Sequence, residues 1–390
     1  MDYVLLPKIE LHAHLTGSVS RLTLHEIWKR KKASGQTDLE DPRAVMPEGK
    51  HDYNLQTFPP QSPRHRSMLR LHMVFAKFVR GRVMVWQNIT ARYYTLMKWR
   101  IALWLVDFFP LFSSYIYNLL TDEESIRYAI NSVLQDFLAD GVVYLELRTT
   151  PRSTTTMSAE AYITVLLGAI EEFESLHPQL HTRLILSIDR RHSIRMAESI
   201  LDLAIRLQDT NKCGVVGIDL CGDPTARPGG EVAMFTPVFE QASRAGLGIT
   251  VHFAEAEASG SHDELRTLLS WNPGRLGHVI WEDEEARKVI VERELCLELC
   301  LSCNVQAEMV HGGFEGHHFG HWKDVKGPKI SLATDDVGVF GSPLSNEYRL
   351  VAQHFHLDRS QICALARQGI EGIFAGEQEK QRLRDIMWKE

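Results

Sequence analysis

Eight short apolar runs recur along the chain, and longer segments in which apolar residues return every three or four positions separate most of them. The short runs are typical of buried β-strands, and the longer period is typical of helices that bury one face. The expected strands are Ile9–Leu15, Val142–Thr149, Arg183–Asp189, Val215–Leu220, Gly248–Phe253, Arg275–Ile280, Leu295–Ser302 and Lys329–Thr334. The expected helices include Ala159–Leu176, Met196–Thr210, Val232–Ala245 and Glu282–Glu294. Eight strands that alternate with helices predict an α/β fold, a (β/α)8 TIM barrel with additional helices.

The end of the chain has helical periodicity as well. Leu344–Lys389 predicts closing helices, with Ser345 expected as the N-cap of the first. A length of 390 residues suits one large barrel or two domains. The strand pattern favours a single barrel over residues 1–390.

Composition and charge narrow the setting. The net charge of −7 gives no reason to expect nucleic acid as a partner. The residues before the first strand lack the basic start of a secretory signal. Cys300 and Cys303 are spaced as a redox pair or half a zinc site would be, but their apolar run favours plain buried thiols and a reducing compartment. We therefore expect a cytoplasmic monomer that binds neither membrane nor nucleic acid.

One region breaks the pattern. Between Phe58 and Asp107 there are nine Lys or Arg residues and one acid, whereas the rest of the chain has 34 basic and 49 acidic residues. Three of the eight tryptophans also fall in this region. The chain therefore carries an anomalous basic insertion at about residues 59–109.

Two interpretations of this insertion stay open. A basic, aromatic-rich segment could touch a membrane or nucleic acid, although Asp107 and Pro110 interrupt the apolar run Ile101–Leu120. The segment could instead be peripheral to the barrel or wrongly included in the chain, for instance as an unspliced intron translated in frame. We favour the second interpretation. An insertion before the second strand could also prevent barrel closure and leave an inactive product.

Polar residues follow several of the apolar runs. His12 and His14 are two positions apart on the first strand, so their side chains share one face. His252 ends the fifth strand and Asp335 follows the eighth. The carboxyl ends of barrel strands meet at one face, where active sites of this fold lie. These four side chains therefore predict a site for one Zn²⁺ with room for a water molecule.

Further polar residues at the same face suit a hydrolytic reaction. A bound zinc would generate hydroxide from water. Glu255 could deliver a proton to a ring nitrogen if burial raises its pKa. His278 could take a proton from the water or stabilise the hydroxide. Asp336 would face a heteroatom of the substrate, and Gly222 would leave a backbone N–H open to it.

These fragments, in this order, resemble the adenosine deaminase branch of the metal-dependent amidohydrolases. The resemblance runs from Leu6–Leu15 to Thr334–Asp336 and the C-terminal helices, and it leaves out the basic segment. It implies a hydrolase acting on the C–N bond of a cyclic amidine. It also implies zinc on His12, His14, His252 and Asp335, a proton donor in Glu255, water activation by His278, and purine contacts from Gly222 and Asp336.

The residue two positions after His14 bears on the substrate. Adenosine deaminases of this branch carry an aspartate there that accepts from the ribose 5′-hydroxyl, whereas this chain has Thr16. A carboxylate beside a phosphate is strongly disfavoured in a pocket of low dielectric constant, but a hydroxyl can donate to phosphate oxygens. Thr16 therefore favours a 5′-monophosphate over a nucleoside, with adenosine deamination as the alternative.

Four further fragments resemble the adenosine deaminase-like subgroup, whose activity is hydrolysis of N6-methyl-AMP to IMP and methylamine. They are Leu147–Arg152, Ile188–Arg191, Gly222–Pro224 and His317–Trp322. The resemblance implies that His14 and Thr16 also contact substrate, together with Thr149, Thr150, Pro151, Arg152 and Asp189. Arg152 suits a phosphate because a guanidinium binds one through paired hydrogen bonds. For Arg190 and Arg191, ion pairs within the protein are as reasonable as a ligand role.

A cluster of histidines in the Gly-rich loop after the seventh strand could be taken for a second metal site. It consists of His311, His317, His318 and His321. Its spacing favours loop packing or a lid.

Overall fold

The computed structural model describes residues 1–46, 111–209, 213–226 and 231–389. Within them, eight strands form one parallel sheet in chain order. The strands are β1 (Lys8–His14), β2 (Val142–Thr149), β3 (His181–Asp189), β4 (Val215–Cys221), β5 (Gly248–Phe253), β6 (Arg275–His278), β7 (Cys296–Leu299) and β8 (Lys329–Leu332). The predicted insertion at about residues 59–109 lies outside the described residues.

The sheet curls until its first and last strands meet. The backbone N–H of His14 donates to the carbonyl oxygen of Asp335 over 2.9 Å, and the N–H of Asp335 donates to that of His12 over 2.8 Å. The eight parallel strands thus form a nearly closed barrel, which confirms the predicted TIM-barrel fold.

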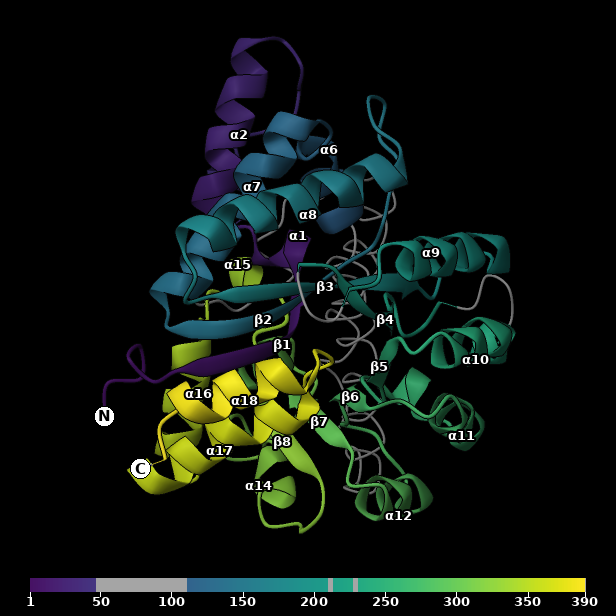
Figure 1. The fold of residues 1–390 in the computed structure, drawn as a ribbon, viewed down its shortest axis with the longest axis vertical. Helices are drawn as coiled ribbons and strands as arrows, with labels where there is room; N and C mark the ends of the chain where they lie inside the picture. The colour runs from purple at the N-terminus through teal and green to yellow at the C-terminus, as the bar shows by residue number, and fades with distance from the viewer. Residues whose placement is uncertain (47–110, 210–212, 227–230, 390) are drawn as a thin grey trace, which may run out of the picture.

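Helices surround this barrel, as Figure 1 shows. Those before β4 are α1 (Leu15–Ser18), α2 (Arg21–Ala33), α3 (Pro42–Val45), the π-helix η2 (Leu111–Ile116), α6 (Tyr117–Leu119), α7 (Glu123–Ala139), α8 (Ala159–Leu176) and α9 (Ile194–Arg206). Those from β4 to β8 are η3 (Val232–Phe235), α10 (Thr236–Arg244), η4 (Glu257–Ser259), α11 (His262–Ser270), α12 (Glu284–Glu292), α13 (Leu301–Gln306) and α14 (Phe319–Trp322). The C-terminal ones are α15 (Val337–Phe340), α16 (Leu344–His354), α17 (Arg359–Gly372) and α18 (Glu377–Ile386).

Local signals explain where many helices begin. The side chains of Ser158, Ser193 and Asp283 accept from backbone N–H groups in the first turns of α8, α9 and α12. Asp122 and Asp358 form capping boxes at α7 and α17. Such caps satisfy N–H groups that have no partner within the helix.

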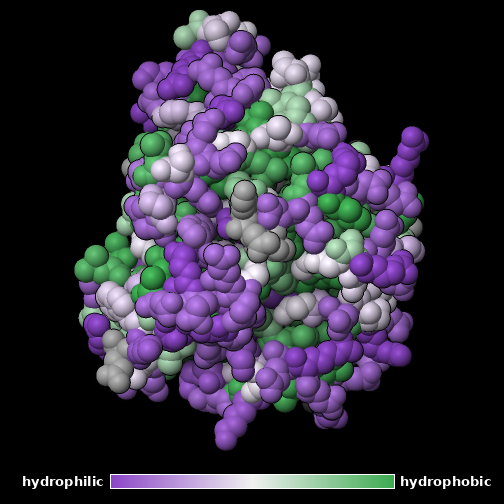
Figure 2. Space-filling view, viewed as in Figure 1, coloured by the Kyte–Doolittle hydropathy of each residue, from purple (hydrophilic) through white to green (hydrophobic). Residues whose placement is uncertain are grey.

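The two faces of the barrel strands differ in chemistry. In β2, Leu145 and Leu147 alternate with Glu146 and Arg148, and all four are fully buried. Alternation along a strand puts the leucines toward the surrounding helices and the charged pair toward the barrel interior. The apolar core therefore lies between sheet and helices, and the barrel interior is polar toward its carboxyl end. Figure 2 shows that hydrophilic side chains cover most of the C-terminal helices on the outside.

The predicted strands agree with the structure to within two residues at each end, except where the seventh strand ends, and one predicted helix N-cap is wrong. The seventh was expected to run to Ser302, but β7 ends at Leu299 and α13 begins at Leu301. Ser345 is not an N-cap, because Pro343 takes that position and α16 begins at Leu344. Proline suits a helix start since its fixed φ fits the first turn and no N–H is wasted.

The predicted helix Val232–Ala245 divides into η3 and α10. The described residues contain no helix that is both long and apolar enough to cross a membrane.

Candidate metal centre and active site

Four side chains converge at the carboxyl end of the barrel. They come from β1, from β5 and from the segment directly after β8. Their potential ligand atoms all lie within 4.8 Å of one another: His12, His14, His252 and Asp335. The Nε2 atoms of His14 and His252 are 3.1 Å apart, and Asp335 Oδ1 lies 3.4 Å from His14 Nε2 and 3.5 Å from His12 Nε2. Ligands of a tetrahedral ion with bonds of about 2.0–2.1 Å lie roughly 3.3 Å apart. The spacing therefore fits one small divalent ion.

Hydrogen bonds on the far side of two rings aim their Nε2 atoms at this point. His12 Nδ1 lies 2.7 Å from Glu298 Oε2, and His252 Nδ1 lies 3.1 Å from Asp219 Oδ1 and 3.0 Å from the carbonyl oxygen of Leu220. All of these partners accept, so each Nδ1 carries a proton and each ring directs its Nε2 toward the candidate metal position.

An unsatisfied atom supports the same interpretation. His12 Nε2 is buried and has no hydrogen-bond partner. A buried polar atom without a partner is costly unless a ligand satisfies it. Three imidazole nitrogens and one carboxylate are a donor set that suits zinc and related divalent ions. The residues present thus fit a metal ion.

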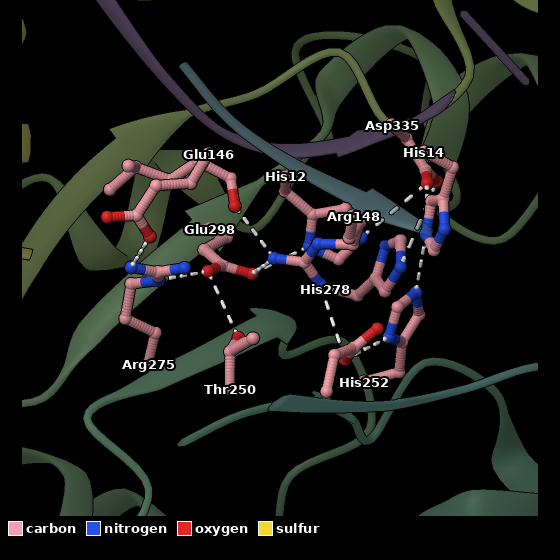
Figure 3. A network of polar contacts seen from close by, with 12 residues as sticks. His12, His14, Glu146, Arg148, Thr250, His252, Arg275, His278, Glu298 and Asp335 are labelled. Atoms are coloured by element: carbon pink, nitrogen blue, oxygen red, sulfur yellow. Dashed lines mark hydrogen bonds and ion pairs between the residues drawn. The ribbon is translucent and has the colours of Figure 1, made fainter. Parts of the chain in front are cut away.

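A buried ionic network lies beneath this centre, as Figure 3 shows. Glu298 is its hub: one carboxylate oxygen faces Arg275 and Thr250, and the other faces Arg148 and His12. Although burial opposes ionisation, Arg148 and Arg275 hold the pKa of Glu298 well below its usual range. The network ties the metal-facing ring of His12 to β2, β5, β6 and β7.

The two predicted catalytic side chains lie beside the four ligands. Glu255 is buried two positions beyond β5, and its Oε1 lies 3.8 Å from Nε2 of His278 at the end of β6. Burial raises the pKa of Glu255 to about 7, against the effect of His252. Glu255 Oε2 and His278 Nε2 are both buried without a hydrogen-bond partner. These atoms are therefore free for a substrate or a water molecule.

The backbone around these residues is unusual. His278, Val279, Ala254 and Asp335 have φ values of 67°, 56°, 52° and 60°. Residues other than glycine rarely adopt this left-handed region, and strain of this kind clusters at functional sites.

Asp336 lies next to the candidate metal ligand Asp335. Burial, then the charges of Asp335 and Glu255, raise the pKa of Asp336 well above its ordinary value. Its Oδ1 is buried without a hydrogen-bond partner. A Cβ on Gly17 would lie 1.6 Å from that oxygen, so only glycine fits there. Close packing against Gly17 thus fixes the position of the carboxyl group in the site.

Comparison with known proteins agrees with this geometry. A model of the adenosine deaminase family matches residues 93–390. The chain belongs to the adenosine deaminase family. It is accordingly an aminohydrolase, and the resemblance noted from its motifs is confirmed.

The most informative relatives are full-length. The chain is 31% identical to an N6-methyl-AMP deaminase of Danio rerio over 397 residues, covering 100% of this chain and 96% of the relative. Arabidopsis ADAL complexed with GMP has a TM-score of 0.75 and 29% identity, covering 99% of this chain and 98% of that one. The ADAL–IMP complex has a TM-score of 0.75 and 30% identity, covering 98% and 96%. Family members of this kind thus bind purine nucleotides.

The residues that the family resemblance assigns to substrate form a second group at the ends of β2 to β4. Thr149 Oγ1 lies 2.7 Å from the hydroxyl of Tyr162, and the guanidinium of Arg152 lies between the rings of Tyr117 and Tyr162. Nη2 of Arg152 also donates to the carbonyl oxygen of Leu120. These contacts fix Arg152 in place, and it forms no ion pair with a carboxylate of the described residues. Thr150 is half-buried and Pro151 is buried beside this group.

The end of β3 meets the end of β4. Asp189 forms a two-point ion pair with Arg191, with distances of 2.8 Å and 2.6 Å. Gly222 has a φ of 93°, and a Cβ there would lie 2.6 Å from the Asp189 carboxylate. Arg190 is buried and pairs with Glu264 over 2.6 Å. The ion-pair interpretation thus holds for both arginines in this structure.

Two expectations about the remaining clusters were tested by the structure. All six cysteines are free, and Cys300 and Cys303 are buried. Cys303 nevertheless donates its S–H to Asp335 Oδ2 over 2.9 Å, and Cys300 lies near His278 and Asp335. The loop histidines do not join any group of metal-ligating side chains among the described residues.

Several residues of the site were missed by sequence reasoning. Asp219, Glu298 and Arg148 support the metal-facing rings, and Asn304 contacts His278. A signal existed for the first three, since a charged residue within a buried apolar strand needs a buried partner. The pattern carries no such signal for Asn304.

Gly277 gives a direct test of the predicted metal ligand His12. An added Cβ at Gly277 would lie 2.6 Å from His12 Cε1 and 2.8 Å from Nδ1, so the ring must move. We expect Gly277→Ala to weaken metal affinity about 10- to 100-fold, as loss of a supporting contact does. Metal content after dialysis against buffered free zinc measures this. Gly168→Ala in α8, where the nearest atom is 3.7 Å away, should bind metal normally. Unchanged metal content in Gly277→Ala would exclude His12 as a ligand.

Proposed function

We propose that this chain is a zinc-dependent hydrolase that converts N6-methyl-AMP and related N6-substituted AMP to IMP and methylamine. One zinc ion would be held by His12, His14, His252 and Asp335, and Glu255 and His278 would be the catalytic residues. The observation that most supports a nucleotide substrate is the presence and position of Thr16. It is buried in α1, directly after the metal-facing strand, where it provides a hydroxyl and no negative charge.

The relatives support this choice of substrate. A full-length relative is named for N6-methyl-AMP, and related structures hold GMP or IMP. All three molecules share a purine and a 5′-phosphate. The residues 1–390 are proposed to act as a single deaminase barrel that carries the basic insertion.

The metal ion, when bound, would make a water molecule acidic enough to ionise near neutral pH. The protein would supply the ligands from rigid strands, and hydrogen bonds donated to Glu298 and Asp219 fix two of the imidazole rings. Preorganised ligands of this kind keep the attacking oxygen at one position relative to the purine.

Glu255 is suited to deliver a proton to the purine. A pKa of about 7 keeps much of its population protonated at neutral pH. As the water oxygen adds to C6, the carboxyl group would protonate the adjacent ring nitrogen, which lets the ring accept the electron pair. The added oxygen still carries a proton, which would move by way of the Glu255 carboxylate to N6, so that the C6–N6 bond breaks as C6=O forms. The proton first lost from the water would restore the acid, which leaves IMP and methylamine as the products of N6-methyl-AMP and water.

Asp336 and Gly222 would orient the purine. The raised pKa of Asp336 favours a protonated carboxyl group, which would donate a hydrogen bond to a ring nitrogen that only accepts. Gly222 has no Cβ, so its backbone N–H can approach a ring closely. His14 adds a half-buried ring beside them.

The phosphate would be bound by neutral and cationic groups. Thr16, Thr149 and Thr150 offer hydroxyls, and Arg152 offers a guanidinium held between two tyrosine rings. Pro151 and Asp189 complete the proposed substrate contacts, with Asp189 paired to Arg191.

Thr16→Asp tests the nucleotide preference. A carboxylate about 4 Å from a phosphate costs roughly 4 kcal/mol at an effective dielectric constant of about 20. We therefore expect kcat/KM for N6-methyl-AMP to fall at least about a hundredfold, while kcat/KM for N6-methyladenosine holds or rises. A panel of AMP, N6-methyl-AMP, adenosine, N6-methyladenosine and adenine on zinc-loaded protein measures both changes.

Thr16→Ser is the matched control, because it keeps the hydroxyl and should keep the preference. Equal kcat/KM for adenosine and N6-methyl-AMP in the unmodified chain would contradict the proposal and favour adenosine deamination.

A further inference from the structure

A chain of hydrogen bonds leads from the loop after β7 to the catalytic histidine. We propose that His317 and Asn304 are positioning residues that hold His278 in the tautomer with its proton on Nε2. His278 then enters the reaction as a hydrogen-bond donor toward the attacking oxygen. The catalytic consequence rests on the proposed function, whereas the tautomer itself does not.

This chain of hydrogen bonds begins at a group that can only be a donor. The backbone N–H of Phe319 can only donate, and it lies 3.0 Å from Nδ1 of His317. His317 Nδ1 must therefore accept and carry no proton. Burial lowers the pKa of His317 well below its ordinary value, so the ring is neutral. Its single ring proton consequently lies on Nε2.

The next link is the side chain of Asn304. His317 Nε2 lies 3.2 Å from Oδ1 of Asn304, where its proton is donated to the amide oxygen. The amide group must then turn its NH2 toward His278, and Nδ2 lies 3.0 Å from His278 Nδ1. Because an NH2 group only donates, His278 Nδ1 accepts. A neutral His278 therefore carries its proton on Nε2.

That proton points into the site. His278 Nε2 is fully buried and has no hydrogen-bond partner, and it lies 3.8 Å from Glu255 Oε1 and 3.9 Å from Asp335 Oδ2. Figure 3 shows the His278 ring beside those of His12 and His252. A donor in this position stabilises negative charge that develops on the attacking oxygen. It cannot at the same time remove a proton from the water.

The same loop also fixes the backbone of His278. His318 Nε2 donates to the carbonyl oxygen of His278 over 2.6 Å, and the rings of His317 and His318 stack with centroids 4.1 Å apart. His318 thus holds the backbone of His278, which has a left-handed φ of 67°, and Asn304 holds its ring. His317 and His318 therefore serve the active site through their contacts with Asn304 and His278.

The tautomer can be read directly by NMR. In protein labelled with ¹⁵N-histidine, a protonated ring nitrogen and an unprotonated one have well-separated chemical shifts. His278→Gln identifies the signals of His278 by their loss. We expect Nε2 protonated and Nδ1 unprotonated, in both zinc-loaded and metal-free protein. A proton on Nδ1 of His278 in the unmodified chain would overturn the proposal.

Asn304→Asp replaces the NH2 donor that faces His278 with an oxygen acceptor and hardly changes the shape of the side chain. A carboxylate can only accept, so His278 Nδ1 should gain a proton in the NMR spectrum. We expect kcat to fall about 10- to 100-fold with zinc content unchanged and KM little altered. A variant that keeps both the tautomer and kcat would contradict the proposal.

His317 offers a rescue test. Glutamine can accept from Phe319 N–H and donate to Asn304, whereas leucine can do neither. His317→Gln should therefore recover most of the kcat that His317→Leu loses, and His321→Leu, in the same loop but exposed, serves as the control. Equal losses in both His317 variants would show a packing role only. If the tautomer is as expected but N6-methyl-AMP is not hydrolysed, the substrate assignment fails and this inference stands.

Discussion

A chain carrying Glu255→Gln is expected to keep its zinc and to lose about 10²- to 10⁴-fold in kcat, the usual contribution of a positioned general acid. The carboxyl group lies close to the predicted ligands, but none of the four depends on it for a hydrogen bond. Glutamine keeps nearly the same shape and cannot supply the proton. The measurement is methylamine release from N6-methyl-AMP, with metal content determined on the same sample.

The pH profile gives a second signature of the same residue. Burial raises the pKa of Glu255 to about 7, and an acid donates only in its protonated form. Activity of the unmodified protein should therefore fall as pH rises above about 7, by about tenfold per unit. The residual activity of Glu255→Gln should lack this fall.

Glu257→Gln is the matched control, because Glu257 is exposed two positions further along. It should behave as the unmodified chain does. Two results would contradict the assignment of Glu255: a normal kcat in Glu255→Gln, or a loss of activity that follows a loss of zinc.

Glu298→Gln is expected to destabilise the protein by about 3–5 kcal/mol, the range found when one member of a buried ionic group is removed. Each oxygen of Glu298 faces two donors: Thr250 and Arg275 on one side, and His12 and Arg148 on the other. The amide NH2 of glutamine would replace one oxygen, so that its N–H donors would face the donors of two neighbouring side chains. The buried groups left without acceptors account for the expected loss.

Urea unfolding of metal-free protein, followed by tryptophan fluorescence, measures this change without any contribution from zinc. Glu294→Gln, at an exposed position before β7, should change the free energy of unfolding by less than about 0.5 kcal/mol. Similar unfolding midpoints for the two variants would show that the network contributes little to stability.

The barrel could be predicted from the sequence because its strands are strongly marked. Val142–Thr149 and Gly248–Phe253 match the observed strands residue for residue, since each follows a glycine or begins with one and is rich in branched apolar residues. The end of β7 could not be placed, because the run through Leu299 and Leu301 is equally apolar on both sides of the strand–helix junction. Periodicity over so few residues does not separate a buried strand from a buried helix.

The candidate site divides in the same way. The predicted metal ligands come from strand ends, so the barrel topology alone brings His12, His252 and Asp335 together. No comparable rule predicts the residues that act through other side chains. Asn304 lies in α13 just beyond the predicted strand Leu295–Ser302, and the spacing of His317 favours loop packing or a lid, whereas its contact with Asn304 is visible only in the structure. Tertiary contacts of single side chains decide these roles.

The meeting of the first and last strands has a consequence for metal loading. His12 and His14 lie on β1, whereas Asp335 follows β8, so seven further strands separate the two parts of the candidate ligand set along the chain. The bridge between Ala13 and Asp335 brings these parts together only when the barrel closes. We therefore expect tight metal binding to require a closed barrel, so that partly folded chains bind the ion weakly.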